Sequence, residues 1–277
     1  MADKRRVVVL VTGASSGIGN SCATALAKNG YVVYGTSRTP EARPRKADEL
    51  FELIRMDVSD DDSVSHAVSY IRAKEGRIDM LVHSAGAGIA GALEETPIHE
   101  ATRQFDVNVM GAARTIHEVL PDMRKEGGTI LLIGSMAGII GFPFQAYQSA
   151  SQHALEGLVD SLRLETAGLP LRISLIQAGG FRTGFAGARK TYGIGEKSPY
   201  EENGRRALAI AERLEKTGAD PILVARLVMK LAARKRVGPR YRAGFVHQRL
   251  AMVIMKYVPV RLAEMLLRSY FELHGKI

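Results

Sequence analysis

Residues 7–19 read V-V-V-L-V-T-G-A-S-S-G-I-G, and the order of residue types in this stretch decides the fold. The first five residues are apolar and mostly β-branched, which predicts a short strand buried on both faces, as in a parallel sheet. Three glycines follow at once, and an apolar-periodic run then predicts a helix that ends near Gly30. A strand, a glycine turn and a helix in this order place the phosphates of a dinucleotide at the N-terminus of the helix.

Each glycine of the turn has its own role in such an arrangement. Gly13 permits the tight turn, Gly17 lets the backbone approach a pyrophosphate, and Gly19 lets the helix pack closely on the strand. Ser15 and Ser16 add hydroxyl donors. The spacing is G-x-x-x-G-x-G instead of G-x-G-x-x-G, so an ordinary strand–turn–helix without a ligand is the alternative interpretation at this point.

The composition indicates a globular α/β protein. We expect residues 1–277 to form a single domain, because 46% of the residues are apolar and no boundary or internal repeat interrupts the pattern. The sole cysteine, Cys22, excludes an intramolecular disulfide and is typical of a reducing, cytoplasmic compartment. No Cys/His cluster has zinc spacing, so no metal is expected. No stretch approaches the ~18 consecutive apolar residues of a membrane span.

The net charge of +9 is unevenly distributed along the chain. Residues 201–277 contain 16 Lys and Arg but 7 Asp and Glu, whereas the first 200 residues contain 22 of each kind. A protein that binds nucleic acid would add aromatic stacking residues or a recognisable reading motif, and the sequence contains neither. The positive charge therefore belongs to the C-terminal quarter, and we expect no nucleic-acid partner.

Strands and helices alternate through the first two-thirds of the chain. The sequence predicts strands at residues 31–36, 51–56, 80–83, 129–133 and 171–176. It predicts helices at 60–74 with Ser59 as N-cap, at 98–125 with an interruption near Gly111, and at 145–167. Later segments predict a helix at 221–236, an edge strand at 239–241, and two helices within 245–273 separated by Pro259. Alternation of this kind is typical of βαβ units and a doubly wound parallel sheet.

The second predicted strand ends at Arg38. In dinucleotide-binding folds, the tip of this strand meets the adenosine ribose, where an acidic residue binds the 2′-hydroxyl group and a basic residue suits a 2′-phosphate. No acid is present here, and Arg38 offers a planar cation. The sequence therefore favours NADP(H) over NAD(H), with a solvated turn residue as the alternative interpretation of Arg38.

Several motifs together resemble those of the short-chain dehydrogenase/reductase family. They are Thr12-Gly13-Ala14-Ser15-Ser16-Gly17-Ile18-Gly19, Asp57-Val58, Asn108 in D-V-N-V, Ser135 in G-S-M-A-G, and Thr183. The resemblance covers roughly residues 5–185. It implies a single-domain Rossmann fold with a seven-stranded parallel sheet, an NAD(P) cofactor, and hydride transfer between an alcohol and a carbonyl of a small-molecule substrate. Homodimers or homotetramers are usual in this family.

The same resemblance implies which residues hold the cofactor. Ile18, within the glycine turn, lies at the phosphates, and Asp57 and Val58 lie at the adenine. Ala85 and Gly86 lie beside the adenosine ribose, and Gly179 and Thr183 lie at the nicotinamide end, with Thr183 at the carboxamide.

The catalytic positions depart from the family pattern. The family has Tyr-x-x-x-Lys within Y-S-A-S-K-x-A-L-E-G, whereas this chain reads Y-Q-S-A-S-Q-H-A-L-E-G from Tyr147. Aligning S-A-S and A-L-E-G puts Gln148 at the tyrosine position and Gln152 at the lysine position. The alternative alignment uses Tyr147 and Ser151, but it breaks the S-A-S match. A helix turns about 100° per residue, so Tyr147 would point away from the face that carries residues 148 and 152.

The two glutamines have a chemical consequence. The family's tyrosine gives or takes the proton of the substrate, and the neighbouring lysine and the nicotinamide lower its pKa. Glutamine forms hydrogen bonds but does not ionise, and loss of general acid–base catalysis typically lowers a rate by ~10²–10⁴-fold. Asn108 and Ser135 remain, so the substrate could still be oriented and a water relay kept. His83 replaces the first Asn of the family's N-N-A-G, and is either a substitute proton carrier or a histidine satisfied by backbone groups.

Three explanations fit the pair of glutamines. They are a deliberate inactivating substitution in an ordinary reductase, a natural relative used for non-redox chemistry, and a protein that binds or senses NADP(H) without reacting. The sequence favours an NADP-dependent oxidoreductase that acts on a ketone or secondary alcohol of a fairly large apolar substrate, with impaired activity. The non-redox enzyme and the binding protein remain the alternatives.

Residues 184–277 are expected to form the substrate lid, the last strand and the C-terminal helices. Residues 184–200 have no clear period and are expected to form a mobile loop, with short helical pieces as the alternative, and their four glycines are candidate hinges. The two helices within 245–273 combine apolar residues with arginines and lysines. Such helices form a lid over a large apolar substrate, a dimer face, or a surface that adsorbs to an anionic membrane. Ordinary packing of a basic solvated face is the fourth interpretation.

Overall fold

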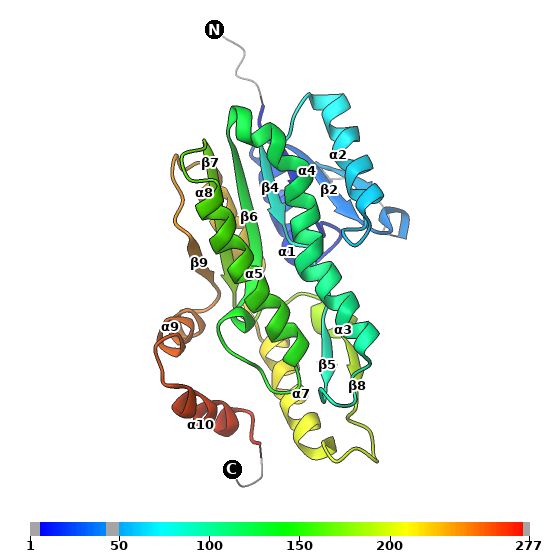
Figure 1. Ribbon diagram of the computed structural model, residues 1–277, viewed down its shortest axis with the longest axis vertical. Coiled ribbons are helices and arrows are strands. Elements are labelled where there is room, and N and C mark those ends of the chain that lie inside the picture. The colour runs from blue at the N-terminus through cyan, green and yellow to red at the C-terminus, as the bar shows by residue number, and fades with distance from the viewer. Residues whose placement is uncertain (1–5, 43–49, 274–277) are drawn as a thin grey trace.

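The computed structural model describes residues 6–42 and 50–273 of the chain. Seven parallel strands form one sheet in the order β3-β2-β1-β4-β6-β7-β9, with helices on both faces (Figure 1). The strands are β1 (Val8–Val11), β2 (Val32–Ser37), β3 (Glu52–Arg55), β4 (Met80–His83), β6 (Gly128–Ser135), β7 (Leu171–Ala178) and β9 (Arg240–Ala243). This arrangement confirms the predicted α/β Rossmann-type fold with a doubly wound parallel sheet.

The sheet is buried on both faces, as the apolar runs of its strands predict. Alternate residues of β1 point into two different hydrophobic clusters. Val9 and Val11 belong to the first cluster, and Val8 and Leu10 belong to the second. The helices over the first cluster are α1 (Gly17–Lys28) and α8 (Ile222–Ala232), and those over the second are α2 (Asp61–Glu75), α4 (Gly111–Glu126) and α5 (Ala146–Glu165). Because both faces are covered, only the edges and ends of the sheet remain for a ligand.

The order of the strands creates a switch point at the carboxyl edge of the sheet. The chain proceeds outward from β1 through β2 to β3 on one side, and from β4 to β9 on the other. Val9 pairs with Val33 of β2 and with Met80 of β4, which holds the three strand ends beside one another. Ligands of open α/β sheets bind at such a point, outside the carboxyl ends of the strands.

The predicted helix that contains Asn108 is divided into three parts. α3 (Ile98–Phe105) is joined to α4 by a π-helical turn, Asp106–Met110, so the interruption immediately precedes Gly111 and includes Asn108. Gly111 is required for close packing, because a Cβ atom on it would lie 2.8 Å from the Cγ2 atom of Val58. Single π-helical turns frequently occur at functional sites, and this one positions a predicted catalytic residue.

The prediction of Ser59 as the N-cap of α2 is wrong. Asp60 is the cap, and its carboxylate accepts a hydrogen bond from the N–H group of Ser63 at 2.8 Å. The hydroxyl group of Ser59 donates to Asp57 at 2.7 Å instead. Both residue types cap helices well, so only the path of the chain after β3 distinguishes them.

The segment between β7 and α8 contains the short helical piece that the sequence pattern allows, and also a strand and a long helix that it does not predict. α6 (Phe185–Ala188) and β8 (Lys190–Tyr192) occupy part of the expected loop, and β8 pairs with β5 (Ile89–Gly91) in a separate two-stranded sheet. The helix α7 (Glu201–Lys216) has no counterpart among the sequence-based expectations. Its buried side is narrow and made mostly of small residues, namely Gly204, Ala207, Leu208 and Ala211. These positions follow the i, i+3, i+4, i+7 spacing of an amphipathic helix, so the sequence carries a signal for α7 that the sequence analysis overlooked.

The C-terminal elements agree with the sequence pattern. β9 forms an edge of the sheet beside β7, and α9 (Val246–Met255) and α10 (Val260–Tyr270) follow it on either side of the predicted break at Pro259. Figure 1 shows α9 and α10 at the lower end of the molecule, the end at which the carboxyl ends of the sheet strands also lie. Within the described ranges, no helix combines the length and the apolar character needed to cross a membrane.

Candidate active site

The glycine turn between β1 and α1 lies at the switch point, and its geometry requires glycine. Gly13 and Gly17 have φ angles of 66° and 55°, in the left-handed region. A Cβ atom on Gly13 would lie 2.9 Å from the Cα atom of Ala85, so glycine lets the segment after β4 approach the turn. A Cβ atom on Gly19 would lie 2.3 Å from the carbonyl oxygen of Gly13, so the first turn of α1 packs directly on the loop.

The N-terminus of α1 carries no side-chain cap. Ser16 is the N-cap residue and has an extended backbone, but its side chain makes no capping hydrogen bond. Ser16 is exposed and Ser15 is half-buried. Among the described residues, no side chain therefore satisfies the N–H groups of the first turn, including that of Ile18, and the positive end of the helix dipole lies there. A phosphate group is the type of acceptor that fits this position.

Thr183, predicted to bind the carboxamide, and Gly179, a second predicted cofactor-binding residue, lie in different environments. Thr183 faces the glycine turn, because a Cβ atom on Gly17 would lie 3.3 Å from the Cβ atom of Thr183. Gly179 lies between β9 and α9: its N–H group donates to the carbonyl of Ala243 at 2.9 Å, and a Cβ atom on it would lie 2.5 Å from Oε1 of Gln248. Thr183 is thus the residue of this pair that borders the crevice, and the cofactor role of both stays a prediction.

The hydroxyl group of Thr12 connects the ends of β1 and β4. Its oxygen accepts hydrogen bonds from the N–H groups of Ser84 and Ala85, both at 2.9 Å. Because the oxygen accepts twice, its proton is directed to Nδ1 of His83, 3.2 Å away. His83 is thereby held as the tautomer with its proton on Nε2, and Nε2 has no hydrogen-bond partner among the described residues.

His83 matches neither of the two interpretations drawn from the sequence. Only 1% of its surface is exposed, and a side chain holds it instead of backbone groups. Burial lowers the pKa of His83 to about 4. The imidazole is therefore neutral near pH 7 and lacks the charged form that a proton carrier would use.

We expect the substitution His83→Asn to remove part of the pH dependence of stability. The native pKa of about 4 lies below the ordinary value of 6.5, so between these values the unfolded chain binds a proton that the folded chain does not. The stabilisation is complete above about pH 6.5, and the free energy of unfolding falls by roughly 3 kcal/mol as the pH drops to 4. Urea unfolding across this range measures the difference in slope.

The matched control for this experiment is His99→Asn, which changes an exposed histidine of α3. We expect this variant to keep the pH dependence of the unmodified protein. A His83→Asn curve parallel to that of the unmodified protein would show that another group causes the acid sensitivity.

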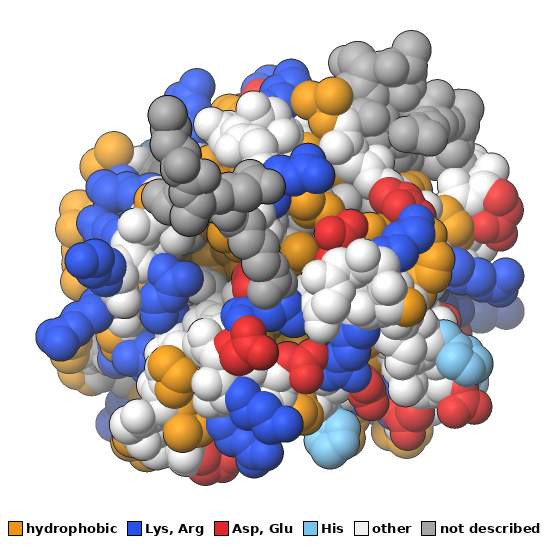
Figure 2. All heavy atoms as spheres, turned by 90° about the horizontal axis from the view of Figure 1, so that it is seen from above, with side chains coloured by type: hydrophobic (Ala, Val, Ile, Leu, Met, Phe, Trp, Pro, Cys, Tyr) orange, Lys and Arg blue, Asp and Glu red, His pale blue; other side chains and the backbone are white. Residues whose placement is uncertain are grey.

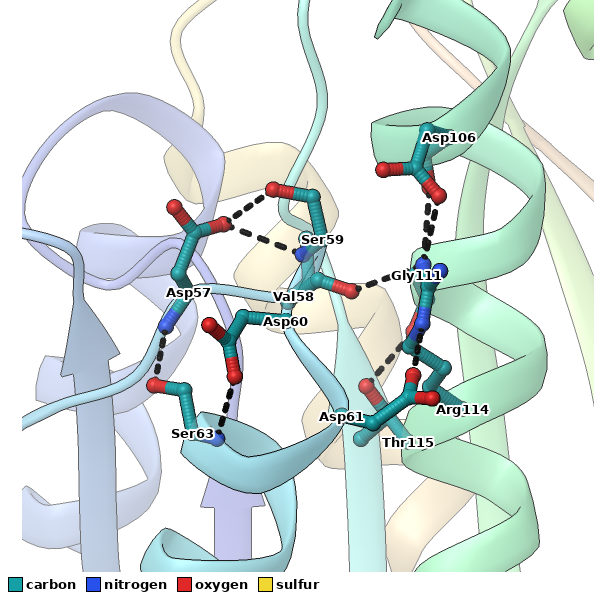
Figure 3. A network of polar contacts seen from close by, with 10 residues as sticks. All are labelled: Asp57, Val58, Ser59, Asp60, Asp61, Ser63, Asp106, Gly111, Arg114 and Thr115. Atoms are coloured by element: carbon teal, nitrogen blue, oxygen red, sulfur yellow. Dashed lines mark hydrogen bonds and ion pairs between the residues drawn. The ribbon is translucent and has the colours of Figure 1, made fainter.

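A network of hydrogen bonds holds the loop after β3 (Figure 3). Oδ1 of Asp57 accepts from the N–H and hydroxyl groups of Ser59 at 3.0 and 2.7 Å, and the N–H group of Asp57 donates to the hydroxyl of Ser63 at 2.9 Å. Burial alone would raise the pKa of Asp57, but the bonds from Ser59 and the positive charge of Arg38 together hold it below its usual value. Oδ2 takes no part in the network, so Asp57 keeps an ionised acceptor for an amino group such as that of adenine.

Arg114 of α4 joins this loop to the π-helical turn (Figure 3). Its guanidinium forms ion pairs with Asp106, at 2.7 Å, and with Asp61, and it lies 3.4 Å from the carbonyl of Val58. Val58 itself is buried. One arginine therefore connects the predicted adenine-binding residues, the start of α2 and the turn that carries Asn108. No motif in the sequence indicated Arg114.

An open groove of about 760 Å³ lies beside Asp57, at the ends of β2 and β3. Its lining residues are Arg38, Thr39, Arg55, Asp57, Asp60, Asp62, Ser63 and His66. Arg38 and Arg55 are both exposed. Since the fold places an adenosine ribose near the tip of β2, a phosphate on that ribose would meet these two cations.

A cluster of buried amide side chains lies between the π-helical turn and α5. Asn108 holds both backbone groups of Ala87, because its Oδ1 accepts the N–H at 2.8 Å and its Nδ2 donates to the carbonyl at 3.0 Å. The same Nδ2 donates to the hydroxyl of Ser151 at 3.0 Å and lies 3.5 Å from Oε1 of Gln148. Gly86 borders this cluster, since a Cβ atom on it would lie 3.5 Å from Oδ1 of Asn108.

Gln104, which the sequence analysis did not single out, determines how Gln148 is oriented. Oε1 of Gln104 accepts the N–H group of Ile89 at 3.0 Å, so its Nε2 group is the one that donates to Oε1 of Gln148. With its oxygen used in this way, Gln148 keeps its Nε2 group as a donor for a partner outside the cluster. The available signal was spacing, because Gln104 precedes Asn108 by four residues, about one helical turn.

Gln152 lies one helical turn after Gln148 on the same buried side of α5. Its Oε1 atom has no hydrogen-bond partner in the part of the chain that the structure describes. The short helix after β6 packs here, since a Cβ atom on Gly138 would lie 3.0 Å from the backbone oxygen of Gln152. Ser135 caps that helix by accepting the N–H group of Ala137 at 3.1 Å, which leaves the hydroxyl proton of Ser135 for another acceptor.

The two alignments of the family motif place different side chains in the cluster. Gln148 and Gln152 are each 9% exposed, and Gln148 contacts Asn108. Tyr147 is half-buried, and its hydroxyl group makes no hydrogen bond within residues 6–42 and 50–273. Ser151, the lysine position of the other alignment, is occupied by bonds to Asn108 and to the carbonyl of Gln148. This geometry supports the alignment on the two glutamines.

The residues present fit a dinucleotide. The phosphate end offers uncapped helical N–H groups and glycines whose Cβ atoms would obstruct the turn, and the adenosine end offers the ionised Asp57. The opposite end offers the donor group of Gln148 and the unpartnered amide oxygen of Gln152. A bound dinucleotide would therefore extend along the carboxyl edge of the sheet.

Comparison with known proteins agrees with this geometry. Residues 7–192 match the family model described as short chain dehydrogenase. The chain belongs to the short-chain dehydrogenase/reductase family. It is therefore an oxidoreductase-family protein whose cofactor is NAD(P).

Three relatives show how far the similarity to this short-chain dehydrogenase/reductase extends. The 3-ketodihydrosphingosine reductase of Bacteroides thetaiotaomicron is 35% identical over 96% of this chain and 98% of its own length. A short-chain dehydrogenase of Streptomyces avermitilis superposes with a TM-score of 0.80, at 28% identity over 98% of both chains. An alcohol dehydrogenase from the archaeon Thermococcus sibiricus, complexed with 5-hydroxy-NADP, gives a TM-score of 0.70 at 25% identity, over 88% of this chain and 98% of its own.

Proposed function

We propose that this protein binds NADP(H) and acts on a ketone, or the corresponding secondary alcohol, of a fairly large apolar molecule, with its rate lowered by Gln148 and Gln152. The observation that carries the proposal is the oriented Gln148 amide at the same edge of the sheet as the uncapped N-terminus of α1. The similarity to a 3-ketodihydrosphingosine reductase over nearly the whole chain supports a long-chain ketone as the substrate class.

The residues of the cluster would stabilise charge on the substrate oxygen. When bound, NADPH supplies a hydride to the carbonyl carbon. The hydroxyl of Ser135 and the Nε2 group of Gln148 are the donors available to the oxygen as it becomes negative, and Gln104 is a positioning residue for Gln148. The side-chain amides of Gln148 and Gln104 cannot release a proton near neutral pH, so the hydroxyl proton of the product comes from water.

A single-turnover measurement tests this function. The protein is mixed with NADPH that carries deuterium at its transferable position and with 3-ketodihydrosphingosine, and the product is analysed by mass spectrometry. We expect slow formation of a deuterated alcohol, with consumption of NADPH. Binding of NADPH without any deuterium transfer would contradict the redox function and favour the cofactor-binding alternative.

Arg38 is proposed to select NADP(H) over NAD(H). We expect Arg38→Ala to raise the Kd for NADPH by roughly 10–100-fold, because it removes a charge-assisted hydrogen bond to the 2′-phosphate, and to leave the Kd for NADH nearly unchanged. Fluorescence titration with both nucleotides measures the two constants. Arg55→Ala changes the second cation of the same groove and is expected to shift the Kd for NADPH in the same direction. Equal weakening of NADPH and NADH by Arg38→Ala would show that Arg38 does not contact the 2′-phosphate.

A further inference from the structure

The C-terminal helices carry an exposed apolar surface. No residue of α10 is buried, although the helix is rich in leucine and other large apolar residues. Eight large apolar side chains of α9, α10 and their connection are 48–79% exposed. We call six of them the C-terminal apolar surface: Leu250, Tyr257, Val260, Met265, Leu266 and Tyr270. A soluble monomer rarely exposes so many large apolar side chains on consecutive helices, so this surface fits a partner.

The surrounding surface is strongly positive. Residues 221–263, which include α8, β9 and α9, contain ten Lys and Arg and no Asp or Glu. Figure 2 looks down on the end of the molecule opposite α9 and α10, and Lys and Arg side chains lie among hydrophobic ones on its left side, the side of β9 in Figure 1. A positive surface without interspersed acidic residues attracts an anionic partner of any shape, and salt weakens the association of that partner with the protein.

A cationic groove runs between α8, β9 and α9. Its volume is about 360 Å³, and five of its nine lining residues are Lys or Arg, with no acid among them. Arg240 is neutralised by Glu156 and Asp160. Lys230, Arg242 and Arg249 form no ion pair within the described residues, and Nε of Arg242 is buried without a hydrogen-bond partner there. The groove therefore holds positive charge that the described protein does not compensate.

The cationic groove and the C-terminal apolar surface share the helix α9. α9 contributes Arg249 and Val253 to the groove, and Leu250, next to Arg249, belongs to the apolar surface. The same helices border the candidate active site. Phe271, directly after α10, packs edge-to-face on Phe142 with ring centroids 5.7 Å apart, in the loop that leads from β6 to α5.

We propose that this combined surface docks reversibly on an anionic lipid bilayer. The C-terminal apolar surface would enter the interfacial region, while Lys230, Arg242 and Arg249 contact acidic headgroups. A second copy of the chain is a poor occupant, because a two-fold contact would bring two uncompensated positive surfaces together. A nucleic acid would satisfy the charge but leave the apolar side chains in water. A bilayer with acidic lipids satisfies both parts of the surface.

Vesicle flotation tests the proposal. The protein is mixed with phosphatidylcholine vesicles that contain either no acidic lipid or about one-third phosphatidylglycerol, at low salt and at about 0.5 M salt. We expect the protein to float with the acidic vesicles at low salt, and to bind at least tenfold more weakly to neutral vesicles and at high salt. Failure to float with acidic vesicles at low salt would overturn the proposal. The assay needs neither NADPH nor substrate, so its outcome is independent of the proposed function.

Two pairs of variants locate the contact. The double variant Lys230→Glu/Arg249→Glu removes two cations of the groove. The double variant Val260→Asp/Met265→Asp disrupts the C-terminal apolar surface. Each double variant is expected to weaken binding to acidic vesicles about tenfold or more. The controls are Arg124→Glu/Lys125→Glu at the end of α4 and Leu164→Asp on α5, where Leu164 is 78% exposed.

The controls are expected to bind acidic vesicles like the unmodified protein, with every variant keeping a cooperative unfolding transition. Equal weakening by the controls would show attraction of net charge alone and overturn the assignment of the surface. A concentration-dependent oligomer that the Val260→Asp/Met265→Asp variant abolishes, without vesicle binding by the unmodified protein, would identify a self-association face and also overturn it.

Discussion

The double substitution Gln148→Tyr/Gln152→Lys is expected to raise the rate of NADPH-dependent ketone reduction by about 10²–10⁴-fold. Both side chains lie on one buried side of α5, and Gln148 already contacts Asn108. A tyrosine at position 148 adds an ionisable hydroxyl where an amide now donates without releasing a proton. A lysine at position 152 lowers the pKa of that tyrosine through its positive charge. Turnover of NADPH with a long-chain ketone measures the gain.

The single variants and a neighbouring tyrosine sharpen this experiment. Gln148→Tyr alone is expected to recover part of the rate, and Gln152→Lys alone almost none, because only the first provides an acid. Tyr147→Phe is expected to leave the activity of both the unmodified protein and the double variant unchanged. If Tyr147→Phe abolished activity, the alignment on the two glutamines would be wrong. If the double variant bound NADPH and gained no activity, the protein would be a non-redox member of its family.

Gly19→Ala is expected to weaken NADPH binding by about 100-fold and to lower the free energy of unfolding by roughly 2 kcal/mol. The added Cβ atom would lie 2.3 Å from the carbonyl oxygen of Gly13, and that contact involves backbone, which cannot rotate away. Relief requires α1 and the turn to separate, which strains the packing and displaces the N–H groups aimed at the phosphates. Loss of two such hydrogen bonds, each worth about 1.5 kcal/mol, corresponds to the expected change in Kd. Isothermal titration and urea unfolding measure the two quantities.

Gly157→Ala is the matched control, because it also changes a helical glycine. Apart from the neighbouring backbone of α5 itself, no atom of the described residues would lie within 4 Å of a Cβ atom at this position. The variant is expected to bind NADPH normally and to be more stable by up to about 1 kcal/mol, since alanine favours helix. Normal binding by Gly19→Ala would mean that the glycine turn is not the phosphate site, whatever its effect on stability.

The sheet and the cofactor edge were predictable because their signals are local. The apolar run before Gly13 and the helical period after Gly19 identify a strand and a helix without knowledge of any contact between them. The strand that ends before Asp57 was predictable for the same reason, and its bounds differ from those of β3 by one residue at each end. α7 has an equally local signal, since its buried residues follow the i, i+3, i+4, i+7 spacing of an amphipathic helix, and the sequence analysis overlooked it.

The N-cap of α2 illustrates a limit of local signals. Ser59 and Asp60 are both good capping residues, and they are adjacent. The choice depends on the turn after β3, where the hydroxyl of Ser59 is already used by Asp57. A contact between side chains therefore decided a feature that the propensities left open.

The sequence by itself determined the fold class, the glycine turn and the pair of glutamines, because each depends on residue types at short spacing along the chain. Only the tertiary structure decided that Gln104 orients Gln148, 44 residues away, and that Arg114 joins Asp61 to Asp106. It also decided that uncompensated cations of α8, β9 and α9 line one groove. These features result from contacts between elements that the fold brings together, and residue spacing along the chain does not encode which side chains then face one another.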